Sequence, residues 1–472
     1  MSSSFSVRVR EALSNERVRG NIRRAMDGLV AKRRQVFPDP RELAVLRQQG
    51  KLIRGYALAK LPDLLLELER NCEANGIRVH WAETVAAANA IVLDLLRRQG
   101  ADLVIKGKSM VSEEMGLNHY LEAQGIRAIE TDLGEFILQL ADERPSHIIA
   151  PAIHKDRFEV AEGFARHFPQ LPYTDDIEGL TATARQLMRE HFRSARTGLS
   201  GVNFAVAETG TLCLVENEGN GRLCTTAPDL HIAVCGIEKV IARLDHLPPL
   251  LTLLTRSATG QPITTYVNMI SGPRRQGELD GPREVHLILL DNGRSRIYGD
   301  RQLRATLRCI RCGACMNHCP VYSRLGGHAY GTVYPGPIGS VLEPQLQGLE
   351  TMGELPEASS LCGACGEACP VRIPLPGLLR RLRAEGVRGR PGSGVPGQGS
   401  RRKPLHRLVW GLWRLVNANP TLYRALTGLV TRLGWLLPLG LGPWSRTRVP
   451  PALARRSLHE LARAEGFRDP SE

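Results

Sequence analysis

The stretch CIRCGACMNHCP, residues 309–320, contains four cysteines, and the last of them directly precedes a proline. Thiolates two residues apart wrap a compact loop around one iron–sulfur cube, so this spacing is typical of iron–sulfur clusters. A second stretch, CGACGEACP at residues 362–370, repeats the pattern with three cysteines. When the two stretches are aligned, Ser359 takes the position that Cys309 has in the first. The chain therefore contains a duplicated cluster-binding unit that lacks one cysteine, and we expect its chemistry to be electron transfer.

The order of the cysteines predicts which of them share a cluster. Where two such motifs follow one another, the cysteine before the proline binds the cluster of the other motif. This crossing rule assigns four cysteines to cluster 1: Cys309, Cys312, Cys315 and Cys369. It leaves three for cluster 2: Cys319, Cys362 and Cys365. Cluster 1 is expected to be 4Fe-4S. Cluster 2 is 3Fe-4S, or it is 4Fe-4S with either a non-cysteine ligand such as Ser359 or an open iron.

Two other uses of these cysteines agree less well with the sequence. Structural zinc sites usually take two separated pairs of ligands, whereas residues 309–315 hold three cysteines in seven positions. Disulfides are disfavoured because no signal peptide opens the chain, and thiols of the cytoplasm, the expected location, stay reduced. The four remaining cysteines stand singly and are expected to be buried thiols: Cys72, Cys213, Cys224 and Cys235.

An α/β domain is predicted for residues 77–298, because strand-like and helix-like segments alternate there. The sequence predicts a helix over 84–99, a second over 113–124, and a mainly parallel sheet from these strands: 77–81, 102–105, 128–131, 147–150, 204–207, 212–215, 231–234 and 285–290. Residues 1–76 are predicted to be a basic helical arm. The arm has no recognisable nucleic-acid reader motif, so we expect a solvated helix face and no nucleic-acid partner.

Two glycine-containing loops of this domain are candidate ligand sites, since glycine permits positive φ and close approach of the backbone to a ligand. The candidate residues are Glu208, Gly210, Glu216, Glu218, Gly219 and Gly221. The alternative is a tight acidic hairpin that needs glycine for its geometry. No Gly-x-Gly-x-x-Gly follows a predicted strand, and residues 106–109 lack the glycine-rich start of a phosphate loop. A nicotinamide or flavin site is therefore not expected.

Several longer stretches carry a resemblance to a known family: residues 107–111, 130–135, 146–155, 201–205, 215–222, 256–260 and 326–331. On these stretches the chain resembles the lactate-utilisation iron–sulfur proteins from about residue 5 to residue 383. The resemblance implies that the α/β domain has the lactate-utilisation (LUD) fold, which is related to the ribose-5-phosphate isomerase and CoA-transferase superfamily. It also implies that residues 299–385 form a helical ferredoxin-type domain with the seven cluster cysteines as ligands.

The same resemblance implies a function and partners. Members of the family act beside a cysteine-rich subunit and a small subunit that contains only the LUD domain, and together they oxidise L-lactate to pyruvate. We expect this chain to be the electron-transfer component rather than a self-sufficient catalyst. The alternative is a CoA-transferase-like or isomerase-like enzyme with structural or regulatory clusters, in which Glu208, Glu216 or Glu218 is the nucleophile.

The C-terminal part is predicted to be a separate region with its own composition. Residues 386–400 are rich in Gly, Pro and Ser and predict a flexible linker. From residue 380 onward, 17 Arg and one Lys face four Glu and one Asp, so this fifth of the chain carries nearly all of the net charge of +14. Residues 401–472 hold four of the five tryptophans: Trp410, Trp413, Trp435 and Trp444. Basic residues with tryptophans favour a helix on an anionic membrane surface; docking on a partner subunit is the alternative. No apolar run is long enough to span a membrane.

Overall fold

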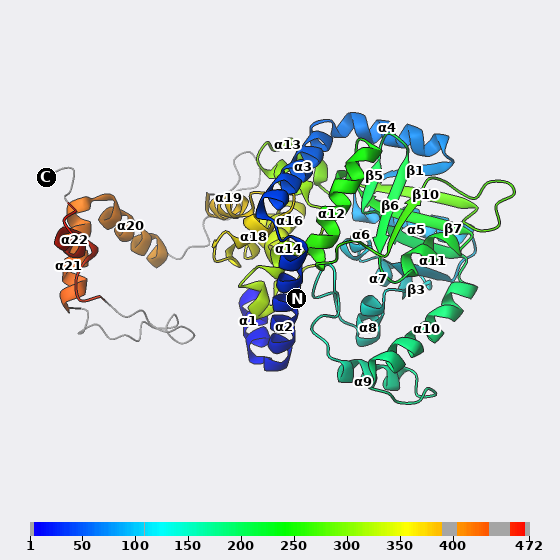
Figure 1. Ribbon diagram of the computed structural model, residues 1–472, viewed down its shortest axis with the longest axis horizontal. Helices are drawn as coiled ribbons and strands as arrows, with labels where there is room; N and C mark the ends of the chain where they lie inside the picture. Colours follow the sequence, from blue (N-terminus) through cyan, green and yellow to red (C-terminus); the bar gives the residue numbers. More distant parts are fainter. Residues whose placement is uncertain (1–3, 108, 389–403, 434–453, 468–472) are drawn as a thin grey trace. The chain divides into compact units, whose positions relative to one another are not determined.

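The computed structural model describes residues 4–107, 109–388, 404–433 and 454–467. The chain divides into two compact units, Met1–Gly386 and Val387–Glu472 (Figure 1). Each unit is described by itself below.

The main sheet of the first unit has six parallel strands in the order β1-β10-β7-β4-β2-β3. The strands are β1 Ile77–Ala82, β2 Leu103–Gly107, β3 Arg127–Glu130, β4 Thr197–Gly201, β7 Leu230–Gly236 and β10 Glu284–Leu290. Every residue of β4 and β7 is buried. Because helices cover both faces of a parallel sheet, its strands are near-continuous apolar runs, and LHIAVCG of β7 is an example.

Helices between the strands bury their apolar faces against this sheet. They are α5 Val85–Arg98, α6 Met110–Glu114, α7 Leu117–Glu122 and α11 Asn220–Thr226. Helix α12 Leu247–Ala258 packs instead on the N-terminal helices. Helix α5 begins after Thr84, whose side chain accepts the Ala87 N–H as an N-cap. Three further helices, α8 Leu133–Ala141, α9 Arg157–His167 and α10 Ile177–Ser194, pack on one another around a small apolar cluster of their own and hang below the sheet in Figure 1.

A second, smaller sheet has the order β8-β5-β6-β9. Its strands are β5 Phe204–Val206, β6 Thr211–Glu216, β8 Val240–Ile241 and β9 Tyr266–Ile270. Strands β5 and β6 form an antiparallel hairpin, and β8 pairs with β5 in parallel. The hydrophobic core of this sheet continues into that of the cysteine-containing region, so the two parts fold as one body.

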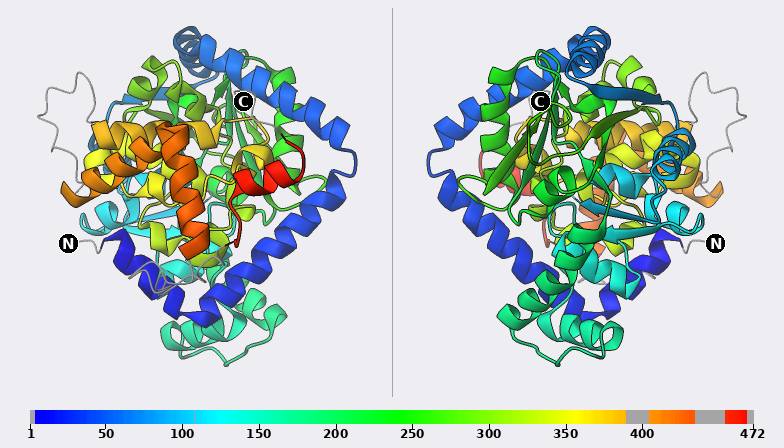
Figure 2. Two further views of the ribbon diagram at one scale, coloured as in Figure 1. Left: turned by 90° about the vertical axis from the view of Figure 1, so that its left-hand side faces the viewer. Right: turned by 90° about the vertical axis from the view of Figure 1, so that its right-hand side faces the viewer.

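The N-terminal helices are α1 Phe5–Ser14, α2 Glu16–Val36, α3 Pro40–Ala59 and α4 Leu61–Ala74. Helices α2 and α3 cross one side of the unit as two long rods that meet at an angle (Figure 2). The bend lies at the segment with Pro38 and Pro40, where Asp39 caps α3 by accepting the Arg41 N–H. Ile22 and Met26 of α2 are buried in the shared core. The N-terminal helices are thus integral to the unit.

The described residues from 291 to 388 contain helices and no strand. The helices are α13 Arg294–Gly299, η3 Leu303–Arg308, α14 Ala314–Asn317, α15 Tyr322–Leu325, η4 His328–Tyr330, α16 Gly336–Gln347, α17 Leu349–Met352, η5 Leu355–Glu357, α18 Ala364–Ala368 and α19 Leu375–Arg388. Most of them have six residues or fewer.

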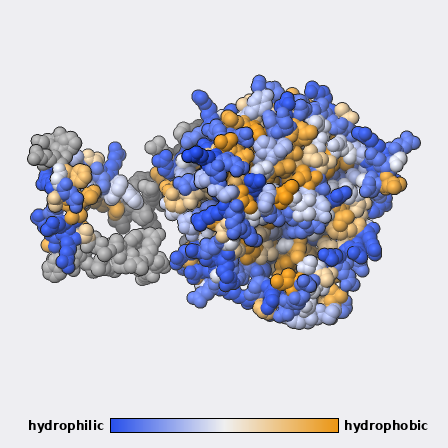
Figure 3. All heavy atoms as spheres, viewed as in Figure 1, coloured by the Kyte–Doolittle hydropathy of each residue, from blue (hydrophilic) through white to orange (hydrophobic). Residues whose placement is uncertain are grey.

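The second unit contains α20 Pro404–Ala418, α21 Pro420–Leu433 and α22 Leu458–Ala464. Trp410 and Trp413 of α20 are 49% and 57% exposed, and Figure 3 shows apolar and hydrophilic side chains next to one another on these helices. Among the described residues, no helix is both long and apolar enough to cross a membrane. Trp435, Trp444, residues 401–403 and the linker positions 389–400 lie outside the described residues.

The α/β fold class predicted from the sequence is confirmed. Two local predictions are wrong. The helix expected over 113–124 is split into α6 and α7 at Gly116, whose φ is +59°. Residues 147–150 form a bend rather than a strand, because His147 Nδ1 accepts the N–H groups of Ile149 and Ala150 and folds the chain back. Strands β4, β8 and β9 were not predicted.

Candidate metal centre

The first cysteine loop is shaped by two left-handed residues. Arg311 has φ +59° and Gly313 has φ +72°, so the chain curls between Cys309 and the start of α14. The Arg311 N–H donates to Cys309 Sγ at 3.4 Å. A Cβ on Gly313 would lie 3.1 Å from a carbon of the His147 ring, so glycine is also needed for close packing.

Four cysteine side chains face one small cavity. Cys309, Cys312 and Cys315 reach it from the first loop, and Cys369 reaches it from the second. The remaining wall is largely apolar and includes Ile338, Val371, Ile373 and Leu375. All four cysteines are buried. This is the group that the crossing rule assigns to cluster 1.

The chemistry of these thiols fits an iron–sulfur group. Burial raises the pKa of the Cys312 thiol to about 12, with Cys309 and Cys369 acting in the same direction. Burial and the neighbouring thiols raise the pKa of Cys315 well above its usual range. Such thiols stay protonated at neutral pH unless a bound cation balances the thiolate charge, which is what iron supplies. The four residues present would therefore hold a thiolate-bound metal group and little else.

Cys319 of the first motif lies with the cysteines of the second. Burial raises the pKa of Cys365 to about 11, and Cys319 is the neighbouring thiol that contributes most to it. Burial raises the pKa of Cys319, and Cys362 adds to the rise. Cys319 and Cys365 are buried, whereas Cys362 is exposed. The seven thiols thus fall into the two groups that the sequence predicts, and the ligation itself stays a prediction.

Arginines of the N-terminal helices support the second loop. Arg47 of α3 donates to the carbonyls of Gly366 and Cys369, both at 3.0 Å. Arg33 of α2 donates to the carbonyl of Ala368 at 3.2 Å. Part of the basic arm thus packs on the second cysteine loop, in addition to the solvated face that the sequence predicts. Sequence reasoning missed these contacts because the arginines lie more than 300 positions from their partners, and helical periodicity does not reveal such distant contacts.

A larger cavity of about 550 Å³ opens in the α/β part next to this centre. Its walls include residues 132–135, residues 148–153 and the loop 216–218. Arg311 lines this cavity and also the cavity of the cluster 1 cysteines. Its guanidinium donates to Glu238 at 3.2 Å and lies 4.6 Å from the centre of the Tyr334 ring. One arginine therefore separates a small-molecule-sized cavity from cluster 1.

The cavity also has a carboxyl group suited to proton exchange. Glu135 lines it, and burial together with the Glu130 carboxylate raises the pKa of Glu135 well above its usual range. Glu130 pairs with the buried Lys106 at 2.5 Å. Lys106 in turn pairs with Glu113 at 2.7 Å. Burial in this acid cluster therefore favours the protonated form of Glu135, a residue that sequence reasoning did not single out.

The candidate ligand loops have mostly structural contacts. Glu216 accepts the N–H groups of Gly221 and Arg222 at 2.7 and 2.6 Å and so holds the start of α11. Glu208 accepts the Leu244 N–H at 2.9 Å.

The glycines of these loops fit the hairpin alternative. Gly210 and Gly219 have φ of +63° and +83°. A Cβ on Gly210 would lie 2.5 Å from the Asn71 carbonyl carbon, and one on Gly221 would lie 3.1 Å from Glu216 Oε2. Of the six candidates, Glu216 and Glu218 line the large cavity. A ligand role for the loops stays a prediction.

The loop of residues 142–156 joins the α/β part to the cysteine region. The Tyr322 hydroxyl donates to the Ser146 carbonyl at 2.6 Å, and the Gly327 N–H donates to Ser146 Oγ at 3.2 Å. His147 Nε2 donates to Asn317 Oδ1 at 2.9 Å. The loop therefore places the α/β domain directly on the first cysteine motif.

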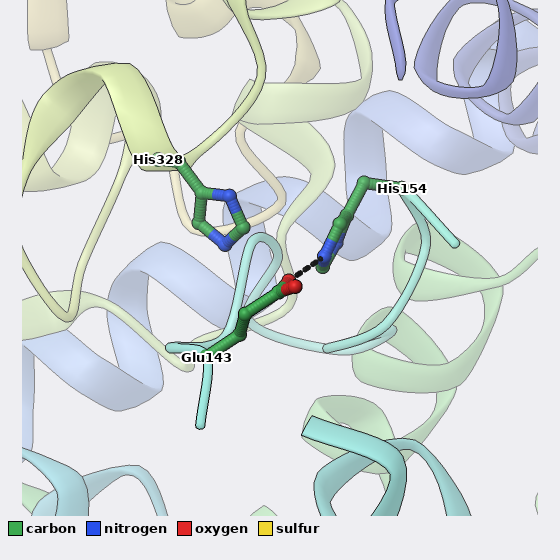
Figure 4. Close-up of side chains that lie close together, drawn as sticks. All are labelled: Glu143, His154 and His328. Carbon is green, nitrogen blue, oxygen red and sulfur yellow. Dashed lines mark hydrogen bonds and ion pairs between the residues drawn. The ribbon is translucent and has the colours of Figure 1, made fainter. Parts of the chain in front are cut away.

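Near this junction, Glu143, His154 and His328 point toward one another (Figure 4). Their ligand atoms lie within 4.8 Å of one another, as in a metal site. His154 Nε2 donates to Glu143 at 2.7 Å, and the Lys155 ammonium pairs with the same carboxylate. His328 Nε2 donates to the Arg144 carbonyl at 2.7 Å. Because lysine already supplies the cation, we interpret this cluster as a polar contact between the two parts.

Comparison with known proteins agrees with this architecture. Three family models match: the LUD domain over residues 65–290, a 4Fe-4S dicluster domain over 305–373, and the C-terminal region of lactate utilisation protein B over 381–467. The chain is 41% identical to "Lactate utilization protein B" of Shouchella clausii, over 98% of each chain. It is 47% identical to the protein of that name from Macrococcus caseolyticus, over 80% of this chain and 79% of the relative. It is 40% identical to an "Uncharacterized electron transport protein YkgF" of Escherichia coli, over 99% and 96%.

Proposed function

Because the chain belongs to the lactate utilization protein B family, we propose that it is the electron-transferring iron–sulfur subunit of a complex that oxidises L-lactate to pyruvate. The observation that carries the proposal is the position of Arg311, which lines both the large cavity and the cavity of the cluster 1 cysteines. A small molecule in the large cavity would lie one side chain away from cluster 1.

Oxidation of L-lactate to pyruvate releases two electrons and two protons. When bound, the clusters accept and release single electrons, so two of them in one chain suit a two-electron donor. The protein residues keep water from cluster 1 by burying its cysteines, and Glu135 offers a carboxyl group that exchanges a proton inside the cavity. Since no Gly-x-Gly-x-x-Gly follows a predicted strand, we place C–H cleavage in the assembled complex rather than in this chain alone.

The exposure of the cysteines gives the path a direction. All four cluster 1 cysteines are buried, whereas Cys362 of cluster 2 is exposed. Electron transfer between proteins needs a short distance between the carriers, so cluster 2 is the site of exchange with another protein. We propose the order cavity, cluster 1, cluster 2, partner.

The partners of this complex are proposed from the family: a cysteine-rich subunit and a small subunit with the LUD domain alone. We place the complex in the cytoplasm, with the basic tail docking on a partner or on the inner membrane face. The exposed tryptophans of α20 and the excess of arginine support a role of this region as a docking surface for a partner or a membrane.

The test is anaerobic addition of L-lactate to the purified chain with and without its two partner subunits. The account predicts that visible absorbance bleaches only with the partners present, because the clusters are then reduced. The chain alone is assayed in parallel for acyl transfer between CoA esters. Acyl transfer without any lactate-dependent bleaching would reject electron transfer and favour a CoA-transferase-like enzyme.

A further inference from the structure

The two cysteine loops share a hydrogen bond as well as a spacing. In the first loop, the Arg311 N–H donates to Cys309 Sγ at 3.4 Å. In the second, the Leu361 N–H donates to Ser359 Oγ at 3.1 Å. Arg311 and Leu361 are both left-handed, with φ of +59° and +57°. The Ser359 oxygen therefore occupies the place in its loop that the Cys309 sulfur occupies in the first.

The correspondence extends along both loops. Gly313 and Gly363 follow the left-handed residues two positions later, with φ of +72° and +93°. The Ala314 N–H donates a hydrogen bond to the Cys312 sulfur, and the Ala364 N–H donates one to the Cys362 sulfur. Helices α14 and α18 then begin at these alanines. Since the backbone repeats at these three pairs of positions, we infer that the side chains at 309 and 359 face equivalent sites.

We propose that Ser359 Oγ is the fourth protein ligand of cluster 2, which is then a 4Fe-4S cluster with one oxygen-bound iron. This inference rests on the two clusters of the proposed function. Binding forms an iron–oxygen bond and breaks the serine O–H bond, and the proton leaves to solvent, which reaches the exposed Cys362. No oxidant or reductant is needed for this exchange.

Neighbouring groups hold Ser359 in place. The Arg383 guanidinium of α19 donates to the Ser359 carbonyl at 2.7 Å and to the Pro356 carbonyl at 2.7 Å. Its positive charge favours a serine oxygen that has lost its proton. The adjacent Ser360 is the competing hydroxyl, because it hydrogen-bonds the Cys362 thiol. Ser360 aligns with Ile310, however, which is not a ligand position in the first loop.

The test compares four full-length proteins prepared anaerobically: the unmodified chain, Ser359→Ala, Ser359→Cys and Ser360→Ala. Iron and sulfide are counted, and low-temperature EPR is recorded on oxidised samples, in which a 3Fe-4S cluster is paramagnetic and a 4Fe-4S cluster is silent. The unmodified chain should hold about eight irons and show no 3Fe-4S signal. Ser359→Ala should fall to about seven irons and gain that signal. Ser359→Cys and Ser360→Ala should keep all irons.

Cluster 1 is the internal standard in each sample, since its EPR signal after reduction shows that the chain has folded. The inference is overturned if Ser359→Ala keeps the iron count and spectrum of the unmodified chain, if Ser360→Ala is the variant that loses iron, or if the unmodified chain already shows the 3Fe-4S signal. None of these readouts uses lactate. Failure of lactate to reduce intact clusters would reject the proposed function and leave the Ser359 assignment standing.

Discussion

The backbone N–H of Arg311 donates to Cys309 Sγ at 3.4 Å. The same residue lines the large cavity, where its guanidinium donates to Glu238. A fixed positive charge this close to cluster 1 stabilises the more negative, reduced state. The same residue thus connects cavity chemistry with the properties of the cluster.

Replacing Arg311 with methionine should lower the reduction potential of cluster 1 and leave that of cluster 2 nearly unchanged, because net charge near a cluster tunes its potential. Stability should fall by about 3 kcal/mol, the low end for breaking a buried pair, since Glu238 still pairs with Arg294 at 2.7 Å. An EPR-monitored redox titration measures the potentials. Arg324→Met, at an exposed position of α15, is the matched control. Equal potentials in both variants would show that Arg311 does not act on cluster 1.

The crossing predicts which cluster each proline-linked cysteine serves. Cys369→Ala should damage cluster 1, although its other ligands all come from the first motif, and Cys319→Ala should damage cluster 2. The two variants are controls for each other. EPR of the reduced proteins identifies the signal that disappears. If Cys369→Ala removes the same signal as Cys365→Ser, each motif holds its own cluster and the crossing is wrong.

Arg47 should stabilise the Cys369 loop from a distance. Arg47→Gln removes the charged hydrogen bonds to the carbonyls of Gly366 and Cys369. A hydrogen bond to a charged group typically contributes about 1.5–3 kcal/mol to the free energy of unfolding. We expect a loss of roughly 2 kcal/mol in unfolding free energy, together with faster release of iron to a chelator. Lys51→Gln, at an exposed position of the same helix, should change neither quantity.

Stability should fall in mild acid because of His231. Burial lowers the pKa of His231 to about 3, and its Nε2 lies 2.8 Å from Ser200 Oγ. Below about pH 6.5 the His231 ring is protonated in the unfolded chain but stays neutral in the folded chain. The free energy of unfolding is therefore at its full value above that pH and decreases as the pH falls. The contribution is about 1.4 kcal/mol per pH unit between about pH 6 and pH 5. Urea unfolding of the unmodified chain and of His231→Gln measures it; identical slopes would contradict this origin.

The tail should be dispensable for the clusters and necessary for attachment. Deleting residues 387–472 removes no cluster cysteine but removes most of the basic excess. Each basic residue near an anionic surface contributes about 1 kcal/mol. Sedimentation with anionic vesicles at low and high salt tests whether the tail binds a membrane surface. If the full-length chain stays in the supernatant at low salt, docking on a partner subunit is the better account of the tail.

Local patterns in the sequence were sufficient for the parts of the fold that depend on near neighbours. The cysteine spacing predicted the two groups of thiols, and apolar runs such as 231–234 and 285–290 predicted β7 and β10. Strand β4 was missed because TGLSG has few apolar or β-branched residues; its burial comes from β2 and β7 on either side. Residues 147–150 look like a strand by composition, but the His147 side chain turns the chain back.

The sequence predicted only those parts of the site whose residues lie within one short segment. The large cavity is assembled from distant segments: Glu135 in one wall and Arg311 in another are 176 positions apart. The same holds for Arg33 and Arg47, whose contacts depend on how α2 and α3 pack on the cysteine region. No periodicity or spacing reports on such contacts.

The most direct test of the central claim is rapid-freeze EPR of the chain assembled with its partner subunits after a single addition of L-lactate. The account predicts that the signal of reduced cluster 1, identified with Cys312→Ser, appears before that of cluster 2, identified with Cys365→Ser, and that both decay when an electron acceptor is added. D-lactate is the control for stereospecific oxidation. If L-lactate is converted to pyruvate while both clusters stay oxidised at every time point, the chain is not on the path of the electrons.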